Sequence, residues 1–258
     1  MISKYFVYFI IYSFIGWIYE TCYCTIHDKT WQNRGFLYGP CIPLYGVGAT
    51  LTQLLFIEIP FPPLHNASYP IIFVICAFGS FVLEYGTSFV LEKKFNARWW
   101  DYSEFPLNIN GRVCLIFTVC FGIAGILVAH LIAPPIMTFV SMIPQYILEL
   151  LSLMFMFLFG MDMALTVSAI TSFAKDFERI NERINAQMAE RVENLEGFKD
   201  QISTEAIKEW FKNASWTERW QFKHIRKFTH PVASTKALLT KGSQYLKDKK
   251  IKTPGFKS

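Results

Sequence analysis

Five long apolar stretches alternate with short polar segments over the first two thirds of the sequence. The hydrocarbon core of a bilayer is about 30 Å thick, so a helix that rises about 1.5 Å per residue needs about 20 apolar residues to cross it. The stretches of suitable length and composition are residues 5–26, 42–59, 69–91, 113–133 and 145–173. The pattern therefore predicts an all-α, polytopic membrane protein with about five transmembrane helices.

The second stretch is the weakest of the five. Gly46 and Gly48 interrupt it, and Glu58 and Pro60 close it. This stretch could therefore cross the membrane fully, or it could be a re-entrant or tilted segment.

Composition agrees with a membrane protein, because 52% of the residues are hydrophobic and only 17% are charged. This balance excludes a soluble enzyme and a small disulfide-stapled secreted domain. Uninterrupted apolar runs exclude a porin-type barrel, whose strands would alternate. The charge is divided near residue 173, with seven basic and nine acidic residues before it and eighteen and eleven after it. We expect a transmembrane region at 1–173 and a basic tail beyond it.

The distribution of basic residues predicts the orientation in the membrane. Lys29 and Arg34 lie between the first two spans, and Lys93, Lys94, Arg98 and Arg112 lie between the third and the fourth. The other two loops contain neither Lys nor Arg. By the positive-inside rule the N-terminus is outside and the C-terminal tail is cytoplasmic, and only Lys4 opposes this arrangement.

The tail divides into two parts. In residues 174–203 an apolar seam at heptad spacing predicts an amphipathic or coiled-coil helix, formed by Phe177, Ile184, Met188, Leu195, Phe198 and Ile202. The seam could fold back on the protein's own cytoplasmic loops, or it could bind a second copy or another partner protein. Residues 204–258 mix aromatic and basic residues, which is typical of a surface that binds anionic lipids of the inner leaflet. We expect no nucleic-acid partner, because no recognised nucleic-acid motif accompanies the basic residues.

Carboxylates inside the predicted spans are the first candidates for function, because an ionised carboxylate in hydrocarbon costs at least about 2.5–3.5 kcal/mol. Glu20 and Glu84 lie at matching depth, each 15 residues into its span. Asp162 lies near the middle of the fifth span. Glu149 lies near the outer end of that span, where an interfacial position accounts for it.

The matching depth belongs to a wider parallel between the two halves. Each Glu-bearing span is followed by a cytoplasmic loop with an Asn/Arg/Gly cluster and then by a glycine-bearing span, which indicates two pseudo-repeats plus one further helix. The candidate polar cluster is Glu20, Asn33, Arg34, Glu84, Asn110, Arg112 and Asp162. The arginines could hold an anionic substrate, or they could pair with the glutamates and only stabilise the fold.

Several chemical functions have no signature in the sequence. It contains no GxxxxGK[ST] phosphate-binding loop, no HExxH metal motif and no GxSxG nucleophile elbow. The six cysteines lie in or beside the spans without metal-ligand spacing, and we expect them to be packing residues. We therefore expect no catalytic residue, cofactor or metal, and no enzymatic activity.

Several motifs together resemble a known family. They are Gly16-Trp17-x-x-Glu20, the run from Asn33 to Pro40, Pro43-x-Tyr45-Gly46, Glu84-Tyr85, Trp99-Trp100-Asp101-Tyr102 and Asn108-x-Asn110-Gly111-Arg112. Over about residues 10–130 the sequence resembles the bacterial membrane family labelled putative ABC-transporter type IV. This resemblance implies a multi-pass protein of the bacterial inner membrane, and it carries no substrate or catalytic residue.

Two functional interpretations follow. The first is a membrane transport component with a polar site near the cytoplasmic leaflet. The second is a non-transporting scaffold or regulator that acts through its cytoplasmic tail.

Overall fold

The computed structural model describes residues 2–28, 35–61, 64–65, 67–189, 213–217, 220 and 227–228, of which residues 27–28, 173–189 and 227–228 are described by backbone alone. Within this part, four helices are long and apolar enough to cross a membrane, at Ile2–Ile26, Tyr69–Phe95, Leu115–Ser141 and Gln145–Ser172. They correspond to the first, third, fourth and fifth predicted spans. The prediction of a mostly helical, polytopic membrane protein is confirmed.

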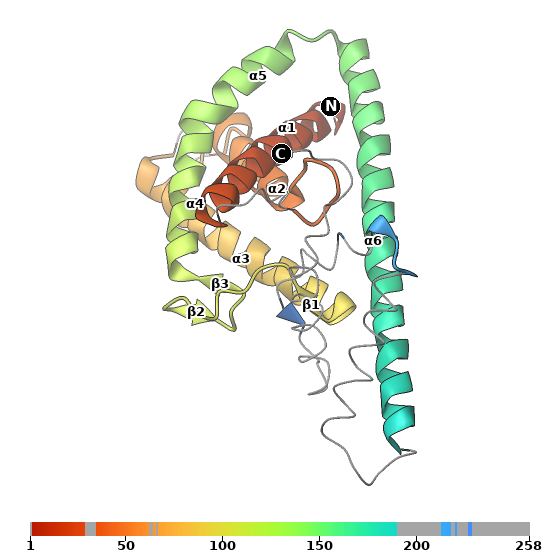
Figure 1. Ribbon diagram of the computed structural model, residues 1–258. Coiled ribbons are helices and arrows are strands. Elements are labelled where there is room, and N and C mark those ends of the chain that lie inside the picture. The colour runs from red at the N-terminus through yellow and green to blue at the C-terminus, as the bar shows by residue number, and fades with distance from the viewer. Residues whose placement is uncertain are drawn as a thin grey trace.

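The helices follow one another along the chain as two hairpins and one long final helix (Figure 1). Two short π-helices, η1 and η2, continue α2 and α4. The helical elements are α1 (Ile2–Asp28), α2 (Pro43–Gln53), η1 (Leu54–Glu58), α3 (Tyr69–Phe95), α4 (Leu115–Leu127), η2 (Val128–Ile132), α5 (Ala133–Ser141) and α6 (Gln145–Ala189). The strands are β1 (Ala97–Arg98), β2 (Asn108–Ile109), β3 (Val113–Cys114) and β4 (Lys227–Phe228), with β1 antiparallel to β4 and β2 antiparallel to β3.

Glycines bring the two helices of each hairpin close together. A Cβ atom on Gly46 of α2 would lie 2.6 Å from the carbonyl oxygen of Phe9 on α1. A Cβ atom on Gly122 of α4 would lie 2.7 Å from the ring of Phe73 on α3 and 3.1 Å from its carbonyl oxygen. Backbones in a membrane protein approach this closely only where a residue lacks a side chain. The glycines therefore fix the spacing within both hairpins.

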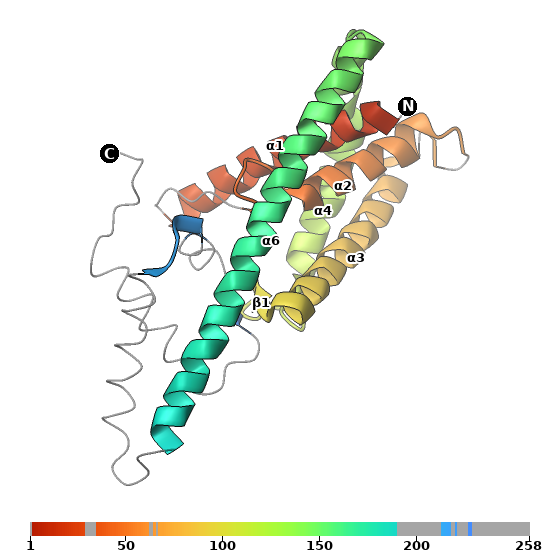
Figure 2. The ribbon, with the colours of Figure 1, turned by 90° about the vertical axis from the view of Figure 1, so that its right-hand side faces the viewer.

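The long helix α6 packs beside the first hairpin and extends beyond the other helices (Figures 1 and 2). Its Phe159 ring makes edge contacts with Phe6 and Phe9 of α1, at centroid distances of 6.3 and 5.4 Å. The helix continues past Phe173 to Ala189, as the sequence predicts. The side chains of the seam at residues 177–202 lie outside the described residues, so the seam remains a prediction.

The second predicted span is not one long helix. Residues 35–42 are non-helical, and the N–H of Ile42 donates to the carbonyl oxygen of Ser13, 3.1 Å away in the middle of α1. Helix α2 therefore begins level with the middle of α1. It has 11 residues, and η1 adds 5, which falls short of the length of the four spanning helices. A fifth full crossing thus remains a prediction.

Described residues of the tail contact the loops of the transmembrane region. The Tyr38 ring lies 4.6 Å from Trp220 and 6.0 Å from Trp216, and its hydroxyl donates to the carbonyl oxygen of Thr217 at 3.2 Å. Strand β4 pairs with β1. The binding of this region to anionic lipids remains a prediction. The rest of residues 204–258 lies outside the described residues.

Candidate functional site

Glu20 on α1 faces the second helix of its own hairpin. The hydroxyl of Tyr45 on α2 donates to Glu20 Oε2 at 2.7 Å. Cys24, one turn further along α1, places its Sγ 4.0 Å from Glu20 Oε1, which is a weak contact. The carboxylate therefore has one good neutral donor.

Glu84 on α3 is more deeply buried, with 3% of its surface exposed. Its Oε1 accepts a long hydrogen bond, 3.3 Å, from the hydroxyl of Tyr102 in the loop after α3. Its Oε2 is buried and has no hydrogen-bond partner. A buried carboxylate with one long hydrogen bond is poorly compensated for the loss of water.

The two carboxylates belong to one polar site, because the tyrosine bonded to each of them packs against the same helix, α4. Phenylalanines of α4 form the apolar side of this site. Phe117 stacks on Tyr102 at 4.7 Å, and Phe121 contacts Tyr45 at 5.7 Å. The site thus joins one Glu–Tyr pair from each half of the transmembrane region.

Burial, followed by the charge of Glu84, raises the pKa of the Tyr102 phenol above its ordinary value. Tyr102 therefore keeps its proton, and it can only donate to Glu84 or accept from another group. It is a permanent neutral donor at the loop side of the site.

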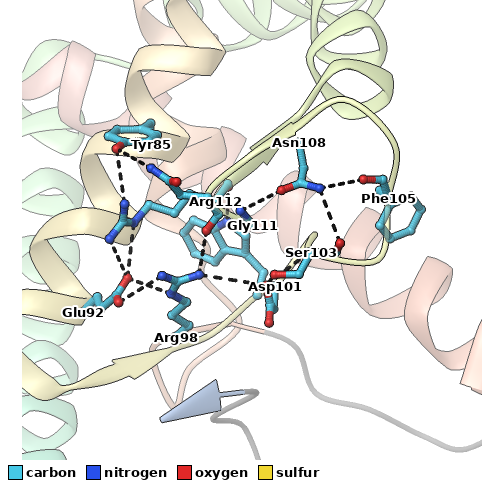
Figure 3. A network of polar contacts seen from close by, with 11 residues as sticks. Tyr85, Glu92, Arg98, Asp101, Ser103, Phe105, Asn108, Gly111 and Arg112 are labelled. Atoms are coloured by element: carbon cyan, nitrogen blue, oxygen red, sulfur yellow. Dashed lines mark hydrogen bonds and ion pairs between the residues drawn. The ribbon is translucent and has the colours of Figure 1, made fainter. Parts of the chain in front are cut away.

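A second polar network lies at the end of α3, where two arginines converge on Glu92 (Figure 3). Arg98 donates to Glu92 from Nε at 2.7 Å and from the second terminal nitrogen at 3.0 Å. Arg112 donates to Glu92 Oε2 at 2.8 Å and to the hydroxyl of Tyr85 at 3.2 Å. The three charged side chains are only 10–14% exposed. Glu92 is therefore the shared anion of a largely buried ion triad.

The triad holds the loop between α3 and α4 in place (Figure 3). Arg98 also donates to the carbonyl oxygen of Asn110 at 2.8 Å, and the Trp100 indole donates to the carbonyl oxygen of Arg112 at 2.9 Å. Gly111 has a φ of 68°, and a Cβ atom there would collide with Asp101. The conformation of this turn thus requires glycine.

Asp162 on α6 holds the non-helical segment before α2. Its two carboxylate oxygens accept from the backbone N–H groups of Tyr38 at 3.0 Å and Gly39 at 2.9 Å. Non-helical backbone at membrane depth requires such protein partners, because lipid supplies none. Asp162 therefore replaces the hydrogen bonds that a helix would have made.

The structure groups the predicted site residues in three places. Glu20 and Glu84 share one site, Asn110 and Arg112 belong to the Glu92 network, and Asp162 binds the segment before α2. Arg112 pairs with Glu92, and no ion pair of the described residues joins it to Glu84. Asn33 and Arg34 lie outside the described residues.

Sequence reasoning missed Tyr45, Tyr102 and Glu92. Both tyrosines stand inside motifs used for the family resemblance, and Glu92 directly precedes Lys93 and Lys94 at the end of an apolar stretch. Nothing in that local pattern marks Glu92 as the partner of two arginines. Among the described residues no group of three or more His, Cys, Asp or Glu side chains could hold a metal ion.

A family model described as putative ABC-transporter type IV matches residues 7–167 of the chain. The match covers both hairpins and reaches into α6 as far as the turn that follows Asp162. The chain therefore belongs to this family, and the resemblance noted in the sequence is confirmed. No curated protein and no solved structure matches the chain.

Proposed function

We propose that this member of the putative ABC-transporter type IV family is a membrane transport component whose polar site is formed by Glu20, Tyr45, Glu84 and Tyr102. One observation carries the proposal: each hairpin contributes a membrane-embedded carboxylate to a shared site, and the described residues give neither carboxylate a cationic partner. A structural ion pair would need such a partner. An arrangement this costly is retained in membranes mainly for function.

Equivalent contacts in the two hairpins support a pseudo-repeat. Phe9 stands eleven residues before Glu20, and Phe73 stands eleven residues before Glu84. Phe9 contacts Gly46 of α2, and Phe73 contacts Gly122 of α4. Helices α2 and α4, which carry these glycines, each pass into a π-helix of 5 residues. Transporters build sites between internal repeats of this kind, and π-helices are frequent at functional sites.

The broken second segment also favours transport. Residues 35–42 enter the helix bundle without helical hydrogen bonds, and Asp162 satisfies their N–H groups. Discontinuous segments near the bilayer midplane are typical of transporter substrate sites. The scaffold interpretation gives no reason for such a segment.

The expected location is the bacterial inner membrane, with the N-terminus outside. Lys4, the one basic residue that opposes this orientation, forms an ion pair with Glu58 at 3.0 Å. Because the sequence has no nucleotide-binding loop, energy must come from a separate ATPase or from an ion gradient.

A strain that lacks the protein tests the proposal without knowledge of the substrate. It is complemented with the wild type, Glu84→Gln or the exposed-site control Glu149→Gln, and solutes are compared between cells and medium. We expect the deletion and Glu84→Gln to shift the same solutes across the membrane and Glu149→Gln to behave as wild type. Wild-type solute distribution in the Glu84→Gln strain, at equal protein level, contradicts the proposal.

The scaffold alternative rests on α6, which extends to Ala189 beyond the other helices. A chain ending at Ala189 separates the two functions in the same strain. The tail carries the function if the shortened chain fails to restore the wild-type solute distribution and no longer binds partner proteins, while Glu84→Gln does both.

A further inference from the structure

Glu84 differs from every other carboxylate that the structure places in a polar network. Glu58 has Lys4, Glu92 has two arginines, and Asp162 has two backbone N–H groups. Glu84 is 97% buried, and one of its oxygens has no hydrogen-bond partner among the described residues. Within the same part of the chain its single hydrogen bond is the 3.3 Å contact with Tyr102.

The groups that face Glu84 give its negative charge no compensation. They are Glu20 from α1, whose own hydrogen bond comes from Tyr45 of α2, and Tyr102 from the loop. Within the described part of the chain, all ion pairs of arginine and lysine are made with Glu58, Glu92 and Asp101. Two anions in one buried site repel each other, and desolvation penalises both.

We propose that Glu84 is a proton-binding site, at which a proton from the cytoplasmic side bonds to the unpartnered Oε2 and makes the carboxyl group neutral. A hydronium ion supplies the proton: one of its O–H bonds breaks, one O–H bond to Oε2 forms, a water molecule leaves, and no oxidation state changes. The proposal identifies the proton as the coupling ion of the transport site, and in that respect it rests on the proposed function. Release of the same proton restores the anion beside Glu20.

A proton fits these side chains better than a metal cation does. A cation requires a shell of several oxygens, and no group of three or more ligating His, Cys, Asp or Glu side chains is present in the described residues. A proton requires a single oxygen, and it removes the repulsion from Glu20 at the same time. Tyr102 donates to Oε1, so Oε2 is the oxygen left for the proton.

Infrared spectroscopy of the full-length protein in lipid nanodiscs tests the proposal directly. The C=O stretch of a protonated carboxyl group is separate from carboxylate bands, and Glu84→Gln identifies its origin. We expect this band at neutral pH in the wild type and in the exposed-site control Glu104→Gln, and its loss in Glu84→Gln. Absence of the band from the wild type, or its persistence in Glu84→Gln, overturns the proposal.

Two further arms keep the test decisive if Glu84→Gln does not fold. Glu20→Gln removes the repelling charge, so the band should disappear at a lower pH than in the wild type, and an unchanged titration contradicts the shared site. Sodium chloride added at constant ionic strength should leave the band unchanged, whereas its loss would assign the site to sodium. These spectra need no transport, so a failed proton site leaves the solute measurements on Glu84→Gln intact.

Discussion

Asp162 shows how one side chain can stabilise an irregular segment inside a helix bundle. Replacement by alanine leaves the N–H groups of Tyr38 and Gly39 without acceptors. Each unsatisfied group costs about 1–3 kcal/mol, so Asp162→Ala should lower the free energy of unfolding by about 2–6 kcal/mol. Denaturant unfolding in detergent measures this loss.

The matched control is Glu149→Ala on the same helix. Glu149 is exposed and bonds only to Gln145 within the described contacts, so its replacement should change the free energy of unfolding by less than about 0.5 kcal/mol. Equal stability of Asp162→Ala and Glu149→Ala would show that the segment before α2 does not depend on Asp162.

Individual site residues could be selected from the sequence by the cost of charge in hydrocarbon. That argument drew attention to Glu20, Glu84 and Asp162, whose functional roles remain predictions. It could not assign partners, because an arginine close to a glutamate in the motif can reach a different glutamate in space. Arg112 does so, and it pairs with Glu92.

At the scale of elements, the glycine contacts give a prediction with an internal control. In Gly46→Ala the new methyl group would meet the Phe9 carbonyl oxygen at 2.6 Å and force α1 and α2 apart. Overpacking of this kind costs about 1–3 kcal/mol. Gly48→Ala on the same helix meets nothing within 4 Å, and alanine's higher helix propensity should leave that variant as stable as the wild type or more stable. Thermal unfolding that ranks Gly48→Ala at or below Gly46→Ala contradicts the close packing.

Four spans could be predicted from apolar length alone, because each is a continuous helix. For the second segment the sequence left a re-entrant or tilted course open, but it gave no sign that the non-helical residues 35–42 would lead to the middle of α1. What fixes this segment is a carboxylate from α6, more than 120 residues away in sequence. Such a long-range contact leaves no local pattern.

For the whole molecule, orientation is the next testable feature. In a background without the native cysteines, Ser141→Cys should react with a membrane-impermeant maleimide in intact cells, because it ends the candidate span Leu115–Ser141 next to a connection without basic residues. Ser103→Cys in the arginine-bearing loop should react only after the membrane is opened. Both positions are exposed, so reactivity reports sidedness. The reverse pattern would invert the orientation.

In the polar organisation of the whole molecule the two glutamates of α3 have opposite roles: Glu92 stabilises the fold and Glu84 serves the transport site. The unfolding free energies of the variants Glu92→Gln and Glu84→Gln test this assignment. Glu92→Gln leaves Arg98 and Arg112 largely buried without their shared anion, and a broken buried pair costs about 3–5 kcal/mol. Glu84→Gln replaces a buried carboxyl group that no described cation pairs with by a neutral amide of similar shape, so it should be at least as stable as the wild type. Denaturant unfolding of the two variants in one detergent is therefore the most direct measurement. A large loss in Glu92→Gln with none in Glu84→Gln is the predicted result, and an equal loss in both would mean that Glu84 also is a structural residue.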